Sequence, residues 1–275
     1  MEHLAEQAAL RLAQLRRERP LIHCITNPVT VNFVANGLLA LGASPVMAPA
    51  VEEVEEMVDH AAGLMLNIGT PCPPTVDAMV RAAERAARRG IPVVFDPVGV
   101  GSTGFRTASA RSIMETGGVT AVRGNASEIR ALGGASGSVR GVDASHSVTD
   151  VEGGLDEAAR RLGVVLCVTG PEDLVSDGRR RFRVGNGDPL MARVTGMGCA
   201  ATAVMAAVLA VEDDPVVGAA LALALFGIAG EMAAVTAMGP GSFAVGFLDA
   251  LHGMAPADVA ARCRIREEKE ERTWH

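Results

Sequence analysis

The sequence predicts a single α/β domain, residues 1–275, with a mostly parallel central sheet and helices on both of its faces. Three observations support this prediction. Short apolar segments alternate with helical segments as far as residue 170, as in successive βα units. These apolar segments are nearly continuous, which is typical of strands that are buried on both faces. Polar residues stand at or just past their carboxyl ends, where open α/β sheets bind ligands.

The first half of the chain contains four predicted strands. A charged amphipathic helix over residues 1–19 precedes them. We expect the strands at residues 21–25, 44–47, 64–70 and 91–96, and helices between them at residues 29–41, 52–62 and 73–89. Gly90 marks the end of the last of these helices, because glycine readily adopts the left-handed conformation that closes a helix. No linker or internal repeat interrupts this alternation.

The second half continues the sheet and ends in helices. Two more strands are expected at residues 121–123 and 164–170, followed by a hairpin of residues 174–178 and 181–184 through an Asp-Gly turn. From Ala200 onward the chain is mostly helical. Residues 216–230 carry no charge, but Glu231 ends this run before the length of about 20 residues that a membrane span needs. We therefore expect a buried helix of a soluble domain and no membrane contact.

The composition disfavours several classes of function. The formal net charge is −7 and aromatic residues make up 3% of the chain, so a nucleic-acid partner is not expected. Five scattered cysteines without a C-x-x-C pair fit a reducing cytoplasm and argue against a disulfide framework or a structural zinc. Lys269 is the only lysine, which excludes a phosphate loop of the G-x-x-x-x-G-K-[ST] type. The charged N-terminal helix differs from a signal peptide, so we expect a cytoplasmic protein.

The stretch from Gly196 to Cys199 is the strongest candidate for a functional turn. A strand-like segment before it gives way to a long apolar helix through two glycines, and the missing β-carbons of Gly196 and Gly198 allow a sharp bend. Unpaired N–H groups and the helix dipole would then form a seat for an anion. A thiol at a helix N-terminus is more acidic than a free one, so Cys199 is a candidate proton acceptor. A tight turn with an inert core cysteine is the alternative.

Charged residues at the strand ends suggest a second part of the site. Asp96 and Glu128 offer the hard oxygen ligands that Mg²⁺ prefers. Asn125 and Glu128 are three residues apart, so a helix capping box is an alternative use of both side chains. Arg123 offers a fixed cation for a phosphate, or an ion pair at a strand end. Thr169 either binds phosphate or simply ends its strand.

A glycine pattern after the fourth predicted strand suggests a different ligand. Residues 99–104 match G-x-G-x-x-G, the pattern of dinucleotide-binding folds. Asp96 and Pro97 separate the pattern from its strand, however, and no acidic residue ends a following strand to hold a ribose. We therefore disfavour dinucleotide binding.

Several segments in order resemble hydroxyethylthiazole kinases, the thiamine-salvage enzymes of the ribokinase-like superfamily. They are residues 20–27, 36–47, 66–70, 96–99, 123–128, 196–199 and 239–243, and the resemblance extends from about residue 20 to residue 251. It implies a three-layer ribokinase-like fold. It also implies ATP-dependent phosphorylation of the primary alcohol of 4-methyl-5-(2-hydroxyethyl)thiazole, with Mg²⁺ and in thiamine biosynthesis or salvage.

The resemblance also assigns roles to residues. It implies thiazole contacts at Asn27, Met47 and Gly196, ATP contacts at Arg123, Thr169 and Glu128, and metal contacts at Asp96 and Glu128. In this reading the Gly196 and Gly198 amides stabilise the moving phosphoryl group, and Cys199 receives the hydroxyl proton. Members of the family are homotrimers with sites between subunits. A pyrimidine or sugar kinase of the same superfamily and a non-catalytic nucleotide-binding sensor remain alternatives.

Overall fold

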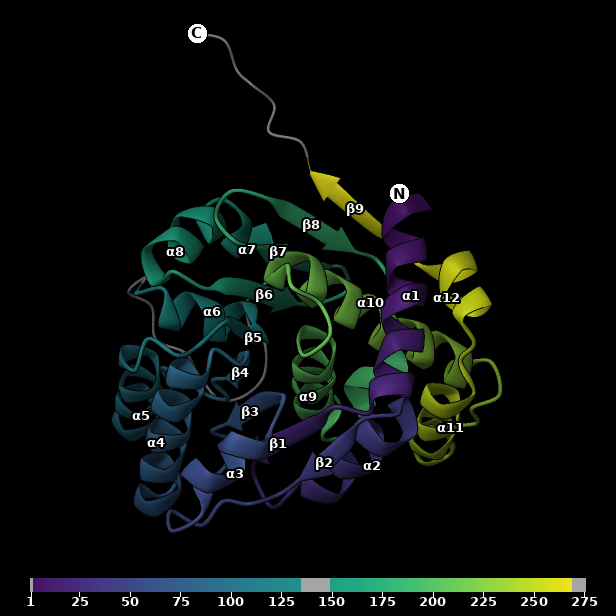
Figure 1. Ribbon diagram of the computed structural model, residues 1–275. Helices are drawn as coiled ribbons and strands as arrows, with labels where there is room; N and C mark the ends of the chain where they lie inside the picture. The colour runs from purple at the N-terminus through teal and green to yellow at the C-terminus, as the bar shows by residue number, and fades with distance from the viewer. Residues whose placement is uncertain (1, 135–148, 269–275) are drawn as a thin grey trace, which may run out of the picture.

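A computed structural model of the chain describes residues 2–134 and 149–268 (Figure 1). Its centre is a nine-stranded sheet with the order β2-β1-β3-β4-β5-β6-β7-β8-β9. The first six strands pair in parallel, and the last three add to one edge in antiparallel orientation. The predicted α/β fold with a mostly parallel sheet is confirmed.

The strands are short and the helices vary widely in length. The strands are β1 (Leu21–Ile25), β2 (Ser44–Val46), β3 (Gly63–Asn67), β4 (Val93–Asp96), β5 (Ala121–Asn125), β6 (Val165–Thr169), β7 (Asp173–Ser176), β8 (Arg181–Val184) and β9 (Ile265–Glu268). The helices before β6 are α1 (Glu2–Glu18), α2 (Val31–Leu41), α3 (Val54–His60), α4 (Pro73–Arg89), α5 (Gly104–Glu115), α6 (Ala126–Leu132), α7 (Thr149–Glu152) and α8 (Leu155–Leu162). A 3₁₀ turn, η1 (Pro189–Arg193), then leads to α9 (Met197–Leu209), α10 (Pro215–Ala234), α11 (Pro240–Gly253) and α12 (Pro256–Arg262).

Both faces of the sheet are covered, which gives three layers. Successive side chains of β3 alternate between two apolar clusters: Met65 belongs to one, and Leu64 and Leu66 belong to the other. This is the period of two that a strand requires. Helices α1, α2 and α9–α12 cover the Met65 face, and helices α3–α6 and α8 cover the opposite face (Figure 1). Strands buried on both faces explain the nearly continuous apolar runs in the sequence.

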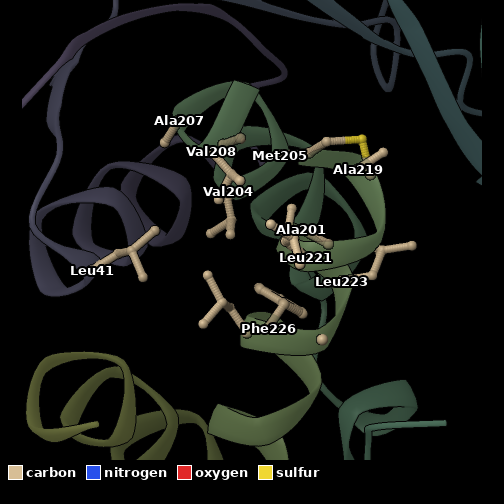
Figure 2. Packing of buried hydrophobic residues seen from close by; sticks show 14 of the residues in the cluster. Leu41, Ala201, Val204, Met205, Ala207, Val208, Ala219, Leu221, Leu223 and Phe226 are labelled. Carbon is tan, nitrogen blue, oxygen red and sulfur yellow. The ribbon is translucent and has the colours of Figure 1, made fainter. Parts of the chain in front are cut away.

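The interior of the first face is built around α9 and α10. Their side chains, including Val204, Met205, Leu221 and Phe226, interdigitate in a core of mainly small and aliphatic residues (Figure 2). Helix α10 has the length and composition of a membrane span, but 89% of its apolar window is buried inside the fold. The expected buried helix is therefore confirmed.

Three local features differ from the sequence-based expectations. Helix α5 and strand β9 were not expected, and the segment before Gly196 is the η1 turn where a strand-like segment was expected. Strand β9 forms because it pairs with β8, with Ile265 opposite Val184 and a side-chain hydrogen bond between Glu268 and Arg183. Asp188 caps η1 by accepting a hydrogen bond from the Leu190 N–H at 2.9 Å.

Candidate active site

The carboxyl ends of the parallel strands bring most of the predicted site residues to one edge of the sheet. In the strand register, Asn67 of β3 stands beside Asp96 of β4, and Asn125 of β5 stands beside Thr169 of β6. Asn27 follows β1 at the same edge. The edge predicted from the sequence is therefore the place where these side chains meet.

Helix α9 begins at this edge of the sheet, and neighbouring side chains closely approach two glycines at its start. Gly196 is its N-cap with φ of 91°, and a β-carbon there would lie 3.2 Å from Cγ2 of Thr30. A β-carbon on Gly198 would lie 2.5 Å from Nη1 of Arg123. The first intrahelical hydrogen bond runs from the Ala200 N–H to the Gly196 carbonyl at 2.8 Å. The amides before Ala200 therefore have no partner within the helix, as at any helix start, and point towards the edge of the sheet.

Cys199 lies in the first turn of α9 against two asparagines. Asn27 Nδ2 donates a hydrogen bond to its sulfur at 3.4 Å, and Asn67 Nδ2 donates one at 3.3 Å. The expected acidic thiol is wrong. Burial, followed by the negative charge of Asp96, raises the pKa of the Cys199 thiol above its usual value, and hydrogen bonds from Thr30 and Asn27 oppose this only in part.

The side chain of Asp96 is 1% exposed, and only one of its two carboxylate oxygens has a hydrogen-bond partner among the described residues. Its Oδ2 accepts hydrogen bonds from Asn67 Nδ2 at 2.8 Å and from Thr202 Oγ1 at 3.0 Å. Its Oδ1 is buried without a partner among the described residues. Burial raises the pKa of the Asp96 carboxyl to about 6, with Arg123 lowering it and Glu128 raising it. One oxygen of this buried carboxyl therefore has no hydrogen-bond partner in the part of the chain that the structure describes.

Glu128 forms the capping box that the sequence left open as an alternative. Its Oε2 accepts the Asn125 N–H at 2.9 Å, and its own N–H donates to Asn125 Oδ1 at 2.9 Å. Its Oε1 accepts the Gly99 N–H at 2.9 Å. Each carboxylate oxygen keeps a further lone pair, so a contact with Mg²⁺ stays a prediction. Within residues 2–134 and 149–268, no three His, Cys, Asp or Glu side chains converge as a ready-made metal site.

Arg123 and Thr169 lie together, as expected of a shared phosphate site. Arg123 Nη2 donates to Thr169 Oγ1 at 2.7 Å, and Arg123 Nη1 is 3.9 Å from Asp96 Oδ2. The Nε of Arg123 is buried and has no partner in the described part of the chain. The guanidinium therefore lies between the Asp96 carboxylate and the Thr169 hydroxyl.

Asn27 and Met47 lie in the loops that follow β1 and β2. Asn27 is 6% exposed, and its Oδ1 accepts a hydrogen bond from Thr30 Oγ1 at 3.2 Å. Met47 directly follows β2 and is half-buried. The next residue, Ala48, is held by a 2.9 Å hydrogen bond between its carbonyl and His23 Nε2. The thiazole contact at Met47 stays a prediction.

Three residues of this cluster were not among the site residues predicted from the sequence. Asn67 was assigned only to a strand, although a polar residue at the end of an apolar run is itself an indication of a site residue. Thr202 is a single polar side chain in an apolar helix, four residues after Gly198. Arg106 of α5 donates hydrogen bonds to the carbonyls of Ile68 at 2.6 Å, Val98 at 2.7 Å and Gly69 at 2.8 Å. It thereby joins the loops after β3 and β4.

Comparisons with known proteins agree on one family. The profile of the Hydroxyethylthiazole kinase family matches residues 12–256. Hydroxyethylthiazole kinase from Desulfotalea psychrophila is 52% identical over 267 residues, which cover 97% of this chain and 98% of the relative. The solved structure of a hydroxyethylthiazole kinase protein from Pyrococcus horikoshii is 42% identical with a TM-score of 0.88, and the match covers 95% of this chain and 99% of that one. A ribokinase-like superfamily protein from Enterococcus faecalis is similar in fold alone, with 12% identity, a TM-score of 0.60 and coverage of 93% of this chain and 95% of that one.

Proposed function

The chain belongs to the hydroxyethylthiazole kinase family, and we propose that the cluster around Cys199 is where ATP phosphorylates the alcohol of 4-methyl-5-(2-hydroxyethyl)thiazole. The observation that carries this proposal is the meeting of the α9 start with Asn27, Asn67 and Asp96. It brings together the free amides at the start of α9, two hydrogen-bonded asparagine side chains and a carboxyl group. These are the parts that positioning and charge stabilisation of a phosphoryl group require.

The chain's own groups would act on the phosphates in two ways. The free amides at Gly198 and Cys199 would donate to the oxygens of the transferring group as its charge spreads. Arg123, held by Thr169, would bind a neighbouring phosphate oxygen through its guanidinium group.

The thiolate form of Cys199 would receive the proton of the substrate hydroxyl, because a protonated thiol cannot take up a second proton. The raised pKa of Cys199 makes this thiolate the minor form at neutral pH, and turnover would proceed through it. A late proton transfer assists this step, because the acceptor oxygen becomes much more acidic once its bond to phosphorus forms. The reaction then forms one O–P bond, breaks the bond to ADP and moves one proton from the hydroxyl oxygen to sulfur.

Mg²⁺ fits the residues present, although the chain alone supplies few ligands. Asp96 offers a buried oxygen without a partner among the described residues. Glu128, in the first turn of α6, would supply a second carboxylate. Mg²⁺ commonly binds through one or two carboxylates together with water and substrate phosphates. When bound, the ion would neutralise phosphate charge.

The proposal further includes a cytoplasmic location and a homotrimer whose active sites lie between subunits. Large apolar side chains are exposed around the end of α10 and on α11: Val235 is 77% exposed, Met238 99% and Val245 65%. These three residues lie close in the chain and would be covered by a neighbouring subunit. Light scattering coupled to size-exclusion chromatography tests the trimer, and a monomer would refute it.

A substrate panel tests the function. Purified protein with ATP and Mg²⁺ is assayed for ADP release with the thiazole alcohol, with a hydroxymethylpyrimidine, with ribose and with no acceptor. We expect release only with the thiazole alcohol, and none after chelation of Mg²⁺. Release with the pyrimidine or ribose alone would favour the related kinases, and ATP binding without acceptor-dependent release would favour a sensor.

A further inference from the structure

Asn67 is the most completely hydrogen-bonded polar side chain at this edge of the sheet. It ends β3 and is 1% exposed. Its Oδ1 accepts the Gly69 N–H at 2.8 Å and Asn27 Nδ2 at 2.8 Å. Because a main-chain N–H can only donate, the Gly69 contact fixes which end of the amide is oxygen. The NH₂ end must therefore face the other way.

The NH₂ group of Asn67 joins the two chemically active side chains. It donates to Asp96 Oδ2 at 2.8 Å and to Cys199 Sγ at 3.3 Å. An amide nitrogen has two hydrogens, so both are used. The second donor to the sulfur, Asn27, is itself oriented by Asn67 Oδ1. Both amide contacts of the Cys199 sulfur thus depend on Asn67.

We propose that Asn67 is a positioning residue for phosphoryl transfer, which holds the Cys199 thiol beside the α9 turn and separates it from Asp96. This inference rests on the proposed kinase function. Asn67 would act through Cys199 and would not itself touch substrate. Without the amide, the sulfur and the carboxylate lose their shared donor, and the Cys199 side chain is free to leave its reactive orientation. A small displacement of a reacting group is costly in rate.

Thr202 provides a matched comparison inside the same network. Its hydroxyl donates either to the same Asp96 oxygen at 3.0 Å or to the Gly198 carbonyl at 3.1 Å. Within the described residues it makes no hydrogen bond with Cys199. Thr202→Val keeps the shape of the side chain and removes only the hydroxyl. It therefore perturbs Asp96 as Asn67→Leu does, but leaves both asparagine donors on the sulfur.

A double-mutant cycle in kcat tests the proposal. Asn67→Leu and Asn67→Asp are each measured in the unchanged protein and in the Cys199→Ala background, with Thr202→Val treated in the same way. Asn67→Asp keeps the oxygen that faces Gly69 but places a second carboxyl beside Asp96, so thermal unfolding monitors the folding of each variant. Asn32→Asp on the exposed side of α2 serves as the surface control, since it keeps the oxygen that Asn36 contacts.

The cycle separates action through the thiol from other roles. We expect both Asn67 changes to lower kcat by about tenfold or more, with KM for the thiazole alcohol within about threefold. In the Cys199→Ala background Asn67→Leu should cost no more than Thr202→Val, because only the shared effect on Asp96 then remains. Thr202→Val should cost the same in both backgrounds. Equal losses for Asn67 in both backgrounds, or a rise in KM alone, would overturn the proposal. Absence of thiazole-dependent ADP release in the unchanged protein would instead refute the kinase function.

Discussion

Gly198 and Arg123 approach so closely that a single added carbon atom would overlap them. A β-carbon on Gly198 would lie 2.5 Å from Nη1 and 3.3 Å from Cζ of the guanidinium. Gly198 does not have a positive φ, so the restriction is one of space and not of backbone strain. The start of α9 and the Arg123 guanidinium can lie this close together only because Gly198 has no side chain.

Gly198→Ala is expected to disturb ATP binding more than folding. The new methyl group must push the Arg123 guanidinium away from Thr169. We expect kcat/KM for ATP to fall by at least about tenfold, equal to about 1.4 kcal/mol, with little change in thermal unfolding. Gly104→Ala is the control, because a β-carbon there meets nothing within 4 Å. Equal effects of the two substitutions would refute the shared anion seat.

Cys199→Ala is expected to slow turnover without weakening thiazole binding. If the Cys199 thiolate receives the hydroxyl proton only in the transition state, its loss should lower kcat by about a hundredfold and leave the thiazole Kd within about threefold. Cys263→Ala, at the junction of α12 and β9, is the matched control. Steady-state kinetics and calorimetric binding separate the two quantities. Unchanged turnover would refute the role of Cys199 as proton acceptor.

Asp173→Asn is expected to stabilise the protein more at high pH than at low pH. Burial raises the pKa of the Asp173 carboxyl to about 7. Between the ordinary value near 4 and about 7, the folded protein therefore holds a proton that the unfolded chain has lost, so stability falls as pH rises through this window. Asparagine removes this fall and keeps the oxygen that accepts the Gly170 N–H.

Thermal unfolding at pH 4, 6 and 8 measures the effect. The difference in Tm between Asp173→Asn and the unchanged protein should grow from pH 4 to pH 8. The exposed Asp213→Asn substitution should show no such trend. A pH-independent difference would mean that the carboxyl titrates normally.

Arg106→Lys is expected to loosen the loops after β3 and β4. A lysine ammonium cannot reproduce the planar fork that reaches three carbonyls on two loops. We expect a loss of about 1–3 kcal/mol in the free energy of unfolding, as for unsatisfied buried carbonyls, and a lower kcat. Arg111→Lys, exposed on the same helix, is the control, and chemical denaturation measures the difference. Equal stability of the two variants would show that the clamp is dispensable.

The sequence predicts the sheet and its ligand edge well because both depend on local patterns. Apolar runs define the six parallel strands, and polar residues ending those runs locate the edge. Strand β9 is different: its charged residues form a strand only because β8 lies beside them, about 80 positions earlier in the chain. No local pattern records that neighbour.

The chemistry of Cys199 shows a second limit. The two glycines in the sequence predict that Cys199 lies at the start of a helix. That position alone predicts a thiol with a lowered pKa. The actual direction of the pKa depends on burial and on Asp96, which is 103 positions away in the chain. Asn67 was overlooked for a similar reason, since its importance lies in which atoms it joins and not in its residue type.

The hydrogen bond between Asn27 and Cys199 joins residues 172 positions apart. A growing polypeptide therefore cannot assemble this cluster until α9 has left the ribosome, by which time eight of the nine described strands have already emerged. Partial translation products and chains cleaved ahead of that helix lack both the glycine turn and the thiol.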